Sequence, residues 1–181
     1  MSPKILLISI FLFLTSCVKD VDFDQSDDLS IQPKYVASLV HFTINQDKFI
    51  DISGNELIKI SENFSTPINT SSVANENITK AEIQFKTTNS FNRTFIVVIK
   101  LFDVAGNSTF NFNPITLNPN TSNKINNQII QGADLNNFVR SNSALMEVIL
   151  MPSADGSVID ANITKSINVQ VSGLFHLNFN F

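Results

Sequence analysis

Hydrophobic residues recur at every second position along much of this chain. In the clearest stretch, residues 94–102, one face of an extended backbone carries Phe95, Val97, Ile99 and Leu101. Because the side chains of a β-strand alternate between two faces, this spacing is typical of a strand that buries one of them. The pattern therefore restricts most of the chain to β-structure.

Further strands are predicted where the same alternation returns, in residues 34–45, 57–60, 81–86 and 145–151 and around Phe110 and Phe112. Gly106-Asn107 and Asp155-Gly156 are turn signals. Residues 61–78, which are rich in Ser, Asn and Thr, are expected to form a long surface loop, and only residues 133–140 favour a short helix. About eight or nine short strands separated by turns predict an all-β fold, an antiparallel β-sandwich of immunoglobulin-like or jelly-roll-like type.

The C-terminal segment poses a problem of length. Its hydrophobic side chains share one parity, from Ile167, Val169 and Val171 to Phe175, Leu177, Phe179 and Phe181. A single strand over residues 166–181 would span about 53 Å, which is longer than expected for a domain of this size. The sequence therefore predicts a bend at Gly173 or a three-residue hairpin loop over residues 172–174.

The N-terminus has the parts of a bacterial export signal. Lys4 supplies a positive charge, residues 5–14 are an apolar core, and small residues precede Cys17, the only cysteine in the chain. Ten apolar residues rise about 15 Å as a helix, half of a hydrocarbon core, so a transmembrane anchor is not expected. Residues 1–16 are predicted to be a lipoprotein signal peptide and Cys17 the lipidated residue, with a plain secretory leader as the alternative.

An acidic stretch follows the cysteine, and the spacing of its carboxylates suggests calcium binding, because hard cations prefer carboxylate oxygens. It departs from an EF-hand loop, since Gln25 stands at the turn glycine and Ile31 at the bidentate glutamate. Residues 17–33 are instead expected to be a lipidated cysteine followed by a solvated flexible tether. Residues 34–181 are expected to form one β-sandwich domain.

The run Cys17-Val-Lys-Asp-Val-Asp-Phe-Asp-Gln25, followed by Asp27-Asp28 and Pro33, resembles the start of small lipoproteins from Bacteroidota, particularly flavobacteria. In those lipoproteins the acidic residues behind the lipidated cysteine resemble a signal for export to the cell surface. The resemblance thus implies that Lys19, Asp20, Asp22 and Asp24 form such a signal, although the acids here alternate with apolar residues. It implies a lipid-anchored outer-membrane protein on the cell surface rather than the periplasmic face, and it implies no activity.

Charge and motif content exclude several classes of protein. With 12 Lys and Arg against 16 Asp and Glu, the chain lacks the basic excess needed for nucleic acid. An acylated Cys17 leaves no thiol for a disulfide, a nucleophile or a metal site. His41 and His176 lie in predicted strands, and neither a P-loop nor a Gly-x-Ser-x-Gly elbow occurs. No catalytic, cofactor or metal residues are predicted.

The sequence therefore favours a non-enzymatic structural or interaction module of the cell envelope. Its expected partners are the membrane, through the lipid, and another envelope protein or a polysaccharide. The alternative is a carbohydrate-binding surface lipoprotein. Sugar-binding platforms usually use Trp or Tyr, and this chain has no Trp and only Tyr35. Exposure of Phe91, Phe110 or Phe112 on one face would favour that alternative.

Overall fold

The computed structural model describes residues 30–66, 76–153, 155–160 and 162–180. They belong to two units. Residues 32–178 form the larger one, and the smaller one contains a short antiparallel ladder between β1 (Ser30–Ile31) and β11 (Phe179–Asn180). The predicted lipidation and export residues Cys17, Lys19, Asp20, Asp22 and Asp24 lie outside the described residues, whereas β1 falls inside the range 17–33 assigned to the tether.

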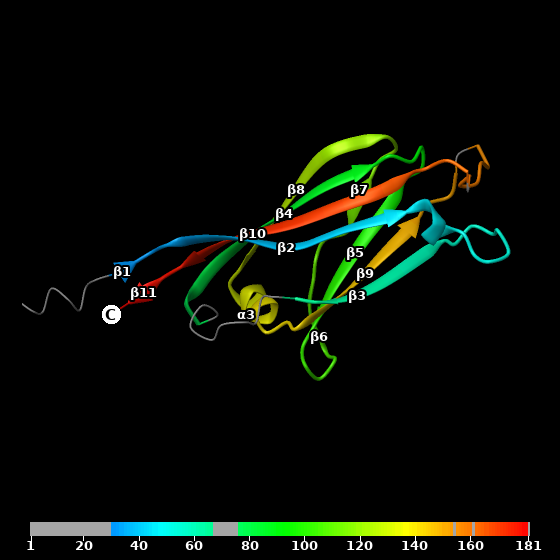
Figure 1. Ribbon diagram of the computed structural model, residues 1–181. Coiled ribbons are helices and arrows are strands. Elements are labelled where there is room, and N and C mark those ends of the chain that lie inside the picture. The colour runs from blue at the N-terminus through cyan, green and yellow to red at the C-terminus, as the bar shows by residue number, and fades with distance from the viewer. Residues whose placement is uncertain (1–29, 67–75, 154, 161, 181) are drawn as a thin grey trace, which may run out of the picture. The chain divides into compact units, whose positions relative to one another are not determined.

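The larger unit is built from two antiparallel sheets (Figure 1). The four-stranded sheet has the order β2 (Lys34–Asn45), β10 (Ser166–Leu177), β4 (Ile78–Asn89) and β8 (Thr121–Gln131). The five-stranded sheet has the order β3 (Lys59–Ser65), β9 (Ser143–Leu150), β5 (Phe95–Phe102) and β6 (Ser108–Asn111), with β7 (Ile115–Leu117) also paired to β5. A 3-10 helix, η2 (Gln46–Phe49), and a short helix, α3 (Ala133–Val139), complete the unit. The predicted antiparallel β-sandwich is confirmed.

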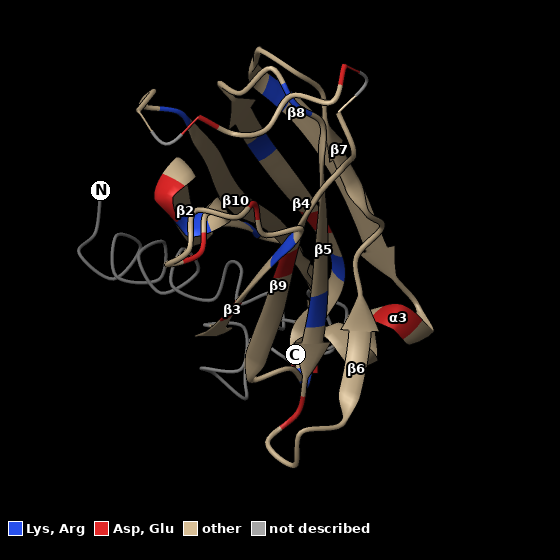
Figure 2. Cartoon of the chain, turned by 90° about the vertical axis from the view of Figure 1, so that its right-hand side faces the viewer, with Lys and Arg blue, Asp and Glu red and all other residues tan. Residues whose placement is uncertain are grey.

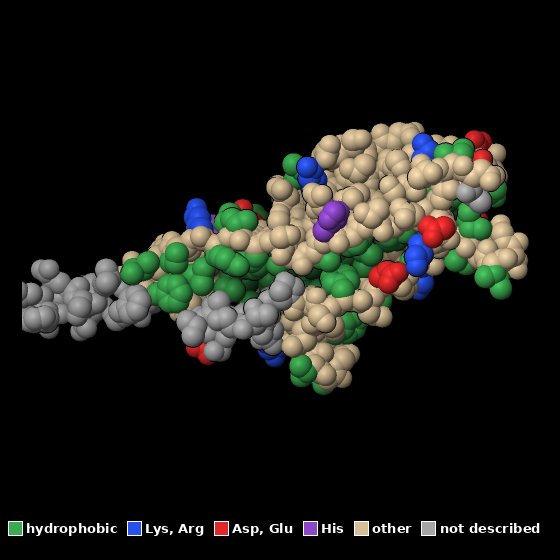
Figure 3. Space-filling model, in the orientation of Figure 1, with side chains coloured by type: hydrophobic (Ala, Val, Ile, Leu, Met, Phe, Trp, Pro, Cys, Tyr) green, Lys and Arg blue, Asp and Glu red, His purple; other side chains and the backbone are tan. Residues whose placement is uncertain are grey.

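The core lies between the two sheets and is made from the alternating residues of both. The four-stranded sheet contributes Ile44, Ala81, Ile83, Phe85, Ile130, Ile167, Val169, Val171 and Phe175, and the five-stranded sheet contributes Ile60, Phe95, Val97, Ile99, Leu101, Ile115, Leu117, Ala144, Met146, Val148 and Leu150. Phenylalanine rings pack near both ends, with Phe49 and Phe95 5.0 Å apart at one and Phe112 and Phe138 6.1 Å apart at the other. Along the β2 and β3 side, hydrophobic side chains form a band between the sheets (Figure 3).

Most of the predicted strands and the helix are confirmed. The stretch 94–102 is β5, and its four alternating hydrophobic residues are all buried. The helix predicted over 133–140 is α3. The loop predicted over 61–78 is wrong in its first part, because β3 continues to Ser65 and pairs with β9. Leu57 and Ile58, predicted to begin that strand, precede it and are exposed.

The hairpin considered at residues 172–174 is wrong. β10 runs unbroken from Ser166 to Leu177 and lies between β2 and β4, each of which is also 12 residues long. Neighbours of equal length satisfy the hydrogen bonds of a strand of about 40 Å, so the chain has no need to turn back. The pairing of β10 is irregular at two points, a register shift against β2 between Val171 and Ser172 and one against β4 between His176 and Leu177.

Gly173 has a packing role inside β10. A Cβ atom there would lie 2.7 Å from the ring of Phe175 and 3.3 Å from Ile83 Cδ1. That ring is itself stacked between Tyr35 and Phe138, with centroid distances of 6.3 and 6.4 Å. Glycine therefore lets Phe175 fold over its own strand.

We expect Gly173→Val to lower the free energy of unfolding by about 1–3 kcal/mol, because the added atoms overpack the Phe175 site. Urea unfolding followed by circular dichroism measures this. Ser172→Ala, one position away on the opposite face, is the control and should stay within about 0.5 kcal/mol of wild type. Equal stabilities for Gly173→Val and the wild type would show that the ring can move aside freely.

Candidate ligand-binding face

The outer face of the four-stranded sheet carries side chains in transverse rows that the strand register defines. In the order β2, β10, β4, β8, successive rows are Thr43, Asn168 and Thr88; His41, Gln170, Lys86 and Ile125; Ser38, Ser172, Gln84 and Asn127; Val36, Leu174, Glu82 and Ile129; and Lys34, His176, Lys80 and Gln131. All of these side chains are exposed or partly exposed. The face is thus mainly polar.

The third of these rows, Ser38, Ser172, Gln84 and Asn127, forms the floor of a depression that we call the transverse trough. Two adjoining hollows of about 290 and 260 Å³ share Ser172 and Gln84. His41, Gln170 and Lys86 line the first hollow, and Val36, Leu174 and Glu82 line the second. The floor is low at β2 and β10 because Ser38 and Ser172 are paired there, while the neighbouring rows on either side carry longer side chains.

Several polar groups of the trough are free to meet a ligand. Among the described residues, the side chains of Ser38, Lys86, Gln170 and Ser172 have no hydrogen-bond partner. On the floor, Gln84 Nε2 donates to Asn127 Oδ1 over 3.3 Å, which orients the two amides. Hydroxyls and amides both donate and accept hydrogen bonds, so this floor suits a ligand rich in hydroxyl groups.

Charge on this face differs from that of the whole chain. Three lysines, Lys34, Lys80 and Lys86, accompany one carboxylate, Glu82, although the chain has a formal net charge of −4. Glu82 is already engaged: Lys80 Nζ lies 2.7 Å and His176 Nε2 2.9 Å from its Oε1. These two hydrogen bonds hold the pKa of Glu82 below its usual value. The cation of Lys86 therefore faces the trough without an acidic partner among the described residues.

The outer face of the five-stranded sheet is different. Its central rows carry Ile96, Val98, Leu145 and Ile149, which are partly exposed. Glu147 bridges Lys59 over 2.8 Å and Lys100 over 3.0 Å, giving a line of alternating charge across β3, β9 and β5 (Figure 2). Those contacts lower the pKa of Glu147. Every charge in this line is paired, so this face offers a ligand less than the other one does.

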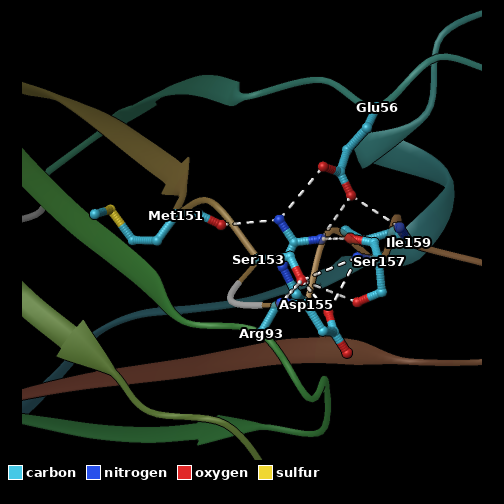
Figure 4. A network of polar contacts seen from close by, with 7 residues as sticks. All are labelled: Glu56, Arg93, Met151, Ser153, Asp155, Ser157 and Ile159. Carbon is cyan, nitrogen blue, oxygen red and sulfur yellow. Dashed lines mark hydrogen bonds and ion pairs between the residues drawn. The ribbon is translucent and has the colours of Figure 1, made fainter.

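Residues 151–165 connect β9 to β10 at one end of the sandwich. There a buried arginine forms hydrogen bonds with two loops (Figure 4). Arg93, 6% exposed, donates through Nη1 to Glu56 Oε1 (3.0 Å) and the Ser157 carbonyl (2.7 Å), and through Nη2 to the Met151 carbonyl (2.8 Å). Glu56 Oε1 also accepts from the Ile159 N–H. These partners all belong to the fold, so we assign the network a structural role.

Glu82 and Glu147 lie on outer faces of opposite sheets, so these two carboxylates cannot act as a catalytic pair. Both histidines belong to the candidate binding face: His41 Nε2 lies 3.1 Å from Asn168 Nδ2, and His176 pairs with Glu82. Within the described ranges, no group of three or more His, Cys, Asp or Glu residues is placed to hold a metal ion.

The aromatic platform that would favour carbohydrate binding is not formed by the phenylalanines considered for it. Phe91 and Phe112 are buried, 3% and 7% exposed. Phe110 packs edge-on against Phe112 and Phe138, with ring centroids 5.1 and 5.9 Å away. Sequence alternation placed these rings in strands or turns but gave no indication of the trough, because its floor is made of small polar residues.

Comparisons with known proteins add little. No family model matches the sequence, and no curated protein matches it. Similar solved structures include a "putative secreted protein" from Parabacteroides distasonis (10% identity, TM-score 0.47, covering 63% of this chain and 36% of that one). Others are VP2 of infectious bursal disease virus (13%, 0.41, 83% and 34%) and tailspike protein 4 of bacteriophage CBA120 (12%, 0.32, 79% and 19%). The chain spans about a third or less of the length of these proteins, and such limited similarity carries no function across.

In the part of the chain that the structure describes, no helix has the length and apolar character needed to cross a membrane.

Proposed function

We propose that this chain is a lipid-anchored, non-enzymatic binding protein of the outer membrane, held on the cell surface through Cys17. The observation that carries the binding role is the transverse trough, where unpartnered hydroxyl, amide and ammonium groups line hollows on an open sheet face. Catalysis needs acid, base or nucleophile groups brought together, and the carboxylates Glu82 and Glu147 occupy outer faces of opposite sheets instead. Another envelope protein and a polysaccharide are both proposed as partners of such a face.

The anchor is supported by the order of residues around Cys17: an apolar core, small residues, the cysteine, and then the acidic run with Lys19, Asp20, Asp22 and Asp24. Acyl chains contribute about 0.8 kcal/mol for each buried methylene, so two or more hold a protein stably on a bilayer. The sandwich then needs no membrane-binding surface of its own.

Metabolic labelling with an alkyne fatty acid tests the anchor. We expect the wild type to incorporate the label and to sediment with outer membranes. Cys17→Ala should remain unlabelled and be released as a soluble protein, while Ser16→Ala, which keeps a small residue before the cysteine, should behave like the wild type. A wild type without label, or Cys17→Ala with as much label as the wild type, would contradict lipidation at this residue.

A further inference from the structure

We propose that the transverse trough binds an extended polysaccharide that carries carboxylate groups, such as a polyuronate. This inference rests on the proposed binding role of the four-stranded sheet and names its ligand class. The first argument is shape. The floor of the trough crosses all four strands, a length of about 14 Å at the usual spacing between strands, and it is open at both sheet edges. A polymer chain can enter and leave such a depression, whereas a small molecule would be poorly enclosed by it.

The second argument is the chemistry of the floor and walls. Ser38, Ser172, Gln84 and Asn127 offer donors and acceptors side by side, which is what the neighbouring hydroxyl groups of a sugar ring require. One wall of the trough carries the aliphatic side chains of Val36, Leu174 and Ile129, which can cover the C–H faces of the rings, with the ion-paired Glu82 between Leu174 and Ile129. Val36 and Ile129 are 69% and 61% exposed, so this surface is available.

The third argument is charge complementarity. The opposite wall holds Lys86 beside Gln170 and His41. Lys86 has no acidic partner among the described residues, and the single carboxylate of the face, Glu82, is occupied by Lys80 and His176. A carboxylate of the ligand would therefore meet an available cation and no available anion. Hydrogen bonds to charged groups are also stronger than neutral ones, so the ion contact would contribute much of the affinity.

A protein partner suits this trough less well. Protein interfaces concentrate their affinity in buried Trp, Tyr and Arg anchors and the apolar pockets that receive them. The aliphatic side chains that line the hollows are Val36, Val171 and Leu174; the other lining side chains are small or polar, with no Phe, Tyr or Trp among them. Among the large hydrophobic residues of the described chain, Tyr35 is the only exposed aromatic one. Its ring stacks on that of Phe175, which belongs to the core.

Affinity electrophoresis tests the inference. The detergent-solubilised full chain is run through native gels that contain alginate, a polyuronate, and through matched gels that contain neutral dextran or dextran sulfate. We expect alginate to retard the wild type and neutral dextran to leave it unretarded. Dextran sulfate should retard it less than alginate, because charge alone lacks the hydroxyl and carboxylate pattern.

Two variants locate the contact. Lys86→Gln should weaken the retardation about tenfold through the loss of one charge-assisted contact, and Ser172→Phe, which fills the floor, should abolish it. The matched controls lie on the other sheet: Lys59→Gln removes the same charge and Ser61→Phe adds the same ring, and neither should change binding. Because Lys86 is exposed and unpartnered, its replacement tests the proposal even if Ser172→Phe folds poorly.

The absence of alginate retardation in the wild type, equal retardation by dextran sulfate, or unchanged binding by Lys86→Gln would each overturn the ligand class. Such a result leaves the anchor intact if the fatty-acid label still appears on Cys17. Loss of the label with retained alginate binding would instead contradict lipidation at Cys17 and support polyuronate binding by the trough. The two failures are therefore distinguishable.

Discussion

Replacing Arg93 with leucine is expected to lower the free energy of unfolding by about 3 kcal/mol or more. The variant leaves the Glu56 carboxylate with the Ile159 N–H as its remaining partner in the network, and it removes the donors of the Met151 and Ser157 carbonyls. Removing a buried arginine is costly because the groups that it serves, two carbonyls and a carboxylate that is only 22% exposed, lose donors that water replaces poorly. Both loops at this end of the sandwich should loosen together.

Urea unfolding of the wild type, Arg93→Leu, Glu56→Leu and the double variant measures the effect. The double variant should recover part of the loss, since it no longer holds an uncompensated charge. Arg140→Leu is the matched control, because Arg140 is exposed and donates through Nη2 to Asn137 Oδ1 at the surface, so its loss should stay within about 0.5 kcal/mol. A change below about 1 kcal/mol in Arg93→Leu would show that the network contributes little.

The second large effect is expected at Asn89, which is 1% exposed at the end of β4. Its Nδ2 donates to the carbonyls of Arg93, Leu117 and Asn118 at 2.8, 3.2 and 2.9 Å, and its Oδ1 accepts from the Phe91 N–H at 3.0 Å. One side chain thus satisfies the turn into β5 and the segment after β7. Asn89→Asp would direct a carboxylate, which only accepts hydrogen bonds, at these oxygens.

We expect Asn89→Asp to lose about 3 kcal/mol or more at pH 7, since a buried carboxylate that keeps only the Phe91 N–H as a donor and otherwise faces carbonyl oxygens costs more than the neutral amide. Burial and facing carbonyls should raise the pKa of the new carboxyl above that in the unfolded chain. The native state then binds the proton more tightly, so the deficit relative to wild type should shrink as the pH falls from 7 to 5. Urea unfolding at both pH values checks this.

Asn111→Asp is the matched control for Asn89, because Asn111 is exposed on β6. It should change the free energy of unfolding by no more than about 0.5 kcal/mol at either pH. If Asn89→Asp were as mild as this control, the carbonyls around Asn89 would have to find other donors, and the side chain would not be the link between β4 and the segment after β7.

The strands that period-two alternation predicts are those that bury every second side chain. β5 and β9 alternate between buried and partly exposed residues along their whole length. β8 was missed, although it is 11 residues long, because its sequence is rich in Asn and Gln and only Ile130 is buried. As an edge strand it is held by its ladder to β4 and by Gln128, whose amide exchanges two hydrogen bonds with the backbone of Asn113. Such a strand has no hydrophobic signature to detect.

Two turns share a sequence pattern, but only the turn at Gly106 is predicted in the sequence analysis. Asp103 and Asn107 close a turn around Gly106, with Asp103 Oδ1 accepting from the Asn107 N–H over 2.8 Å. Asp51 and Asn55 close the same kind of turn around Gly54, also over 2.8 Å, and both glycines have positive φ, 80° and 82°. The shared pattern Asp-x-x-Gly-Asn is the signal that would have identified the turn around Gly54.

The candidate binding face could not be predicted, because it arises from register between strands far apart in sequence. Ser38, Gln84, Asn127 and Ser172 become neighbours only once β2, β10, β4 and β8 are aligned. Alternation also assigns Ser172 and Gln84 to the solvent side without saying what stands next to them. The charge of the face also depends on register, which places Lys34, Lys80 and Lys86 there beside a single carboxylate although the chain as a whole is acidic.

Protease accessibility on intact cells tests most directly whether this protein is a binding module displayed at the cell surface. We expect external proteinase to digest the wild type without lysis, and Cys17→Ala to be missing from the cell surface. A variant with Lys19→Ala and Asp20→Ala should keep its lipid but become protected until the outer membrane is opened. A wild type that survives on intact cells and is digested only after lysis would contradict surface display, and the ligand of the trough would then have to be a component of the periplasm.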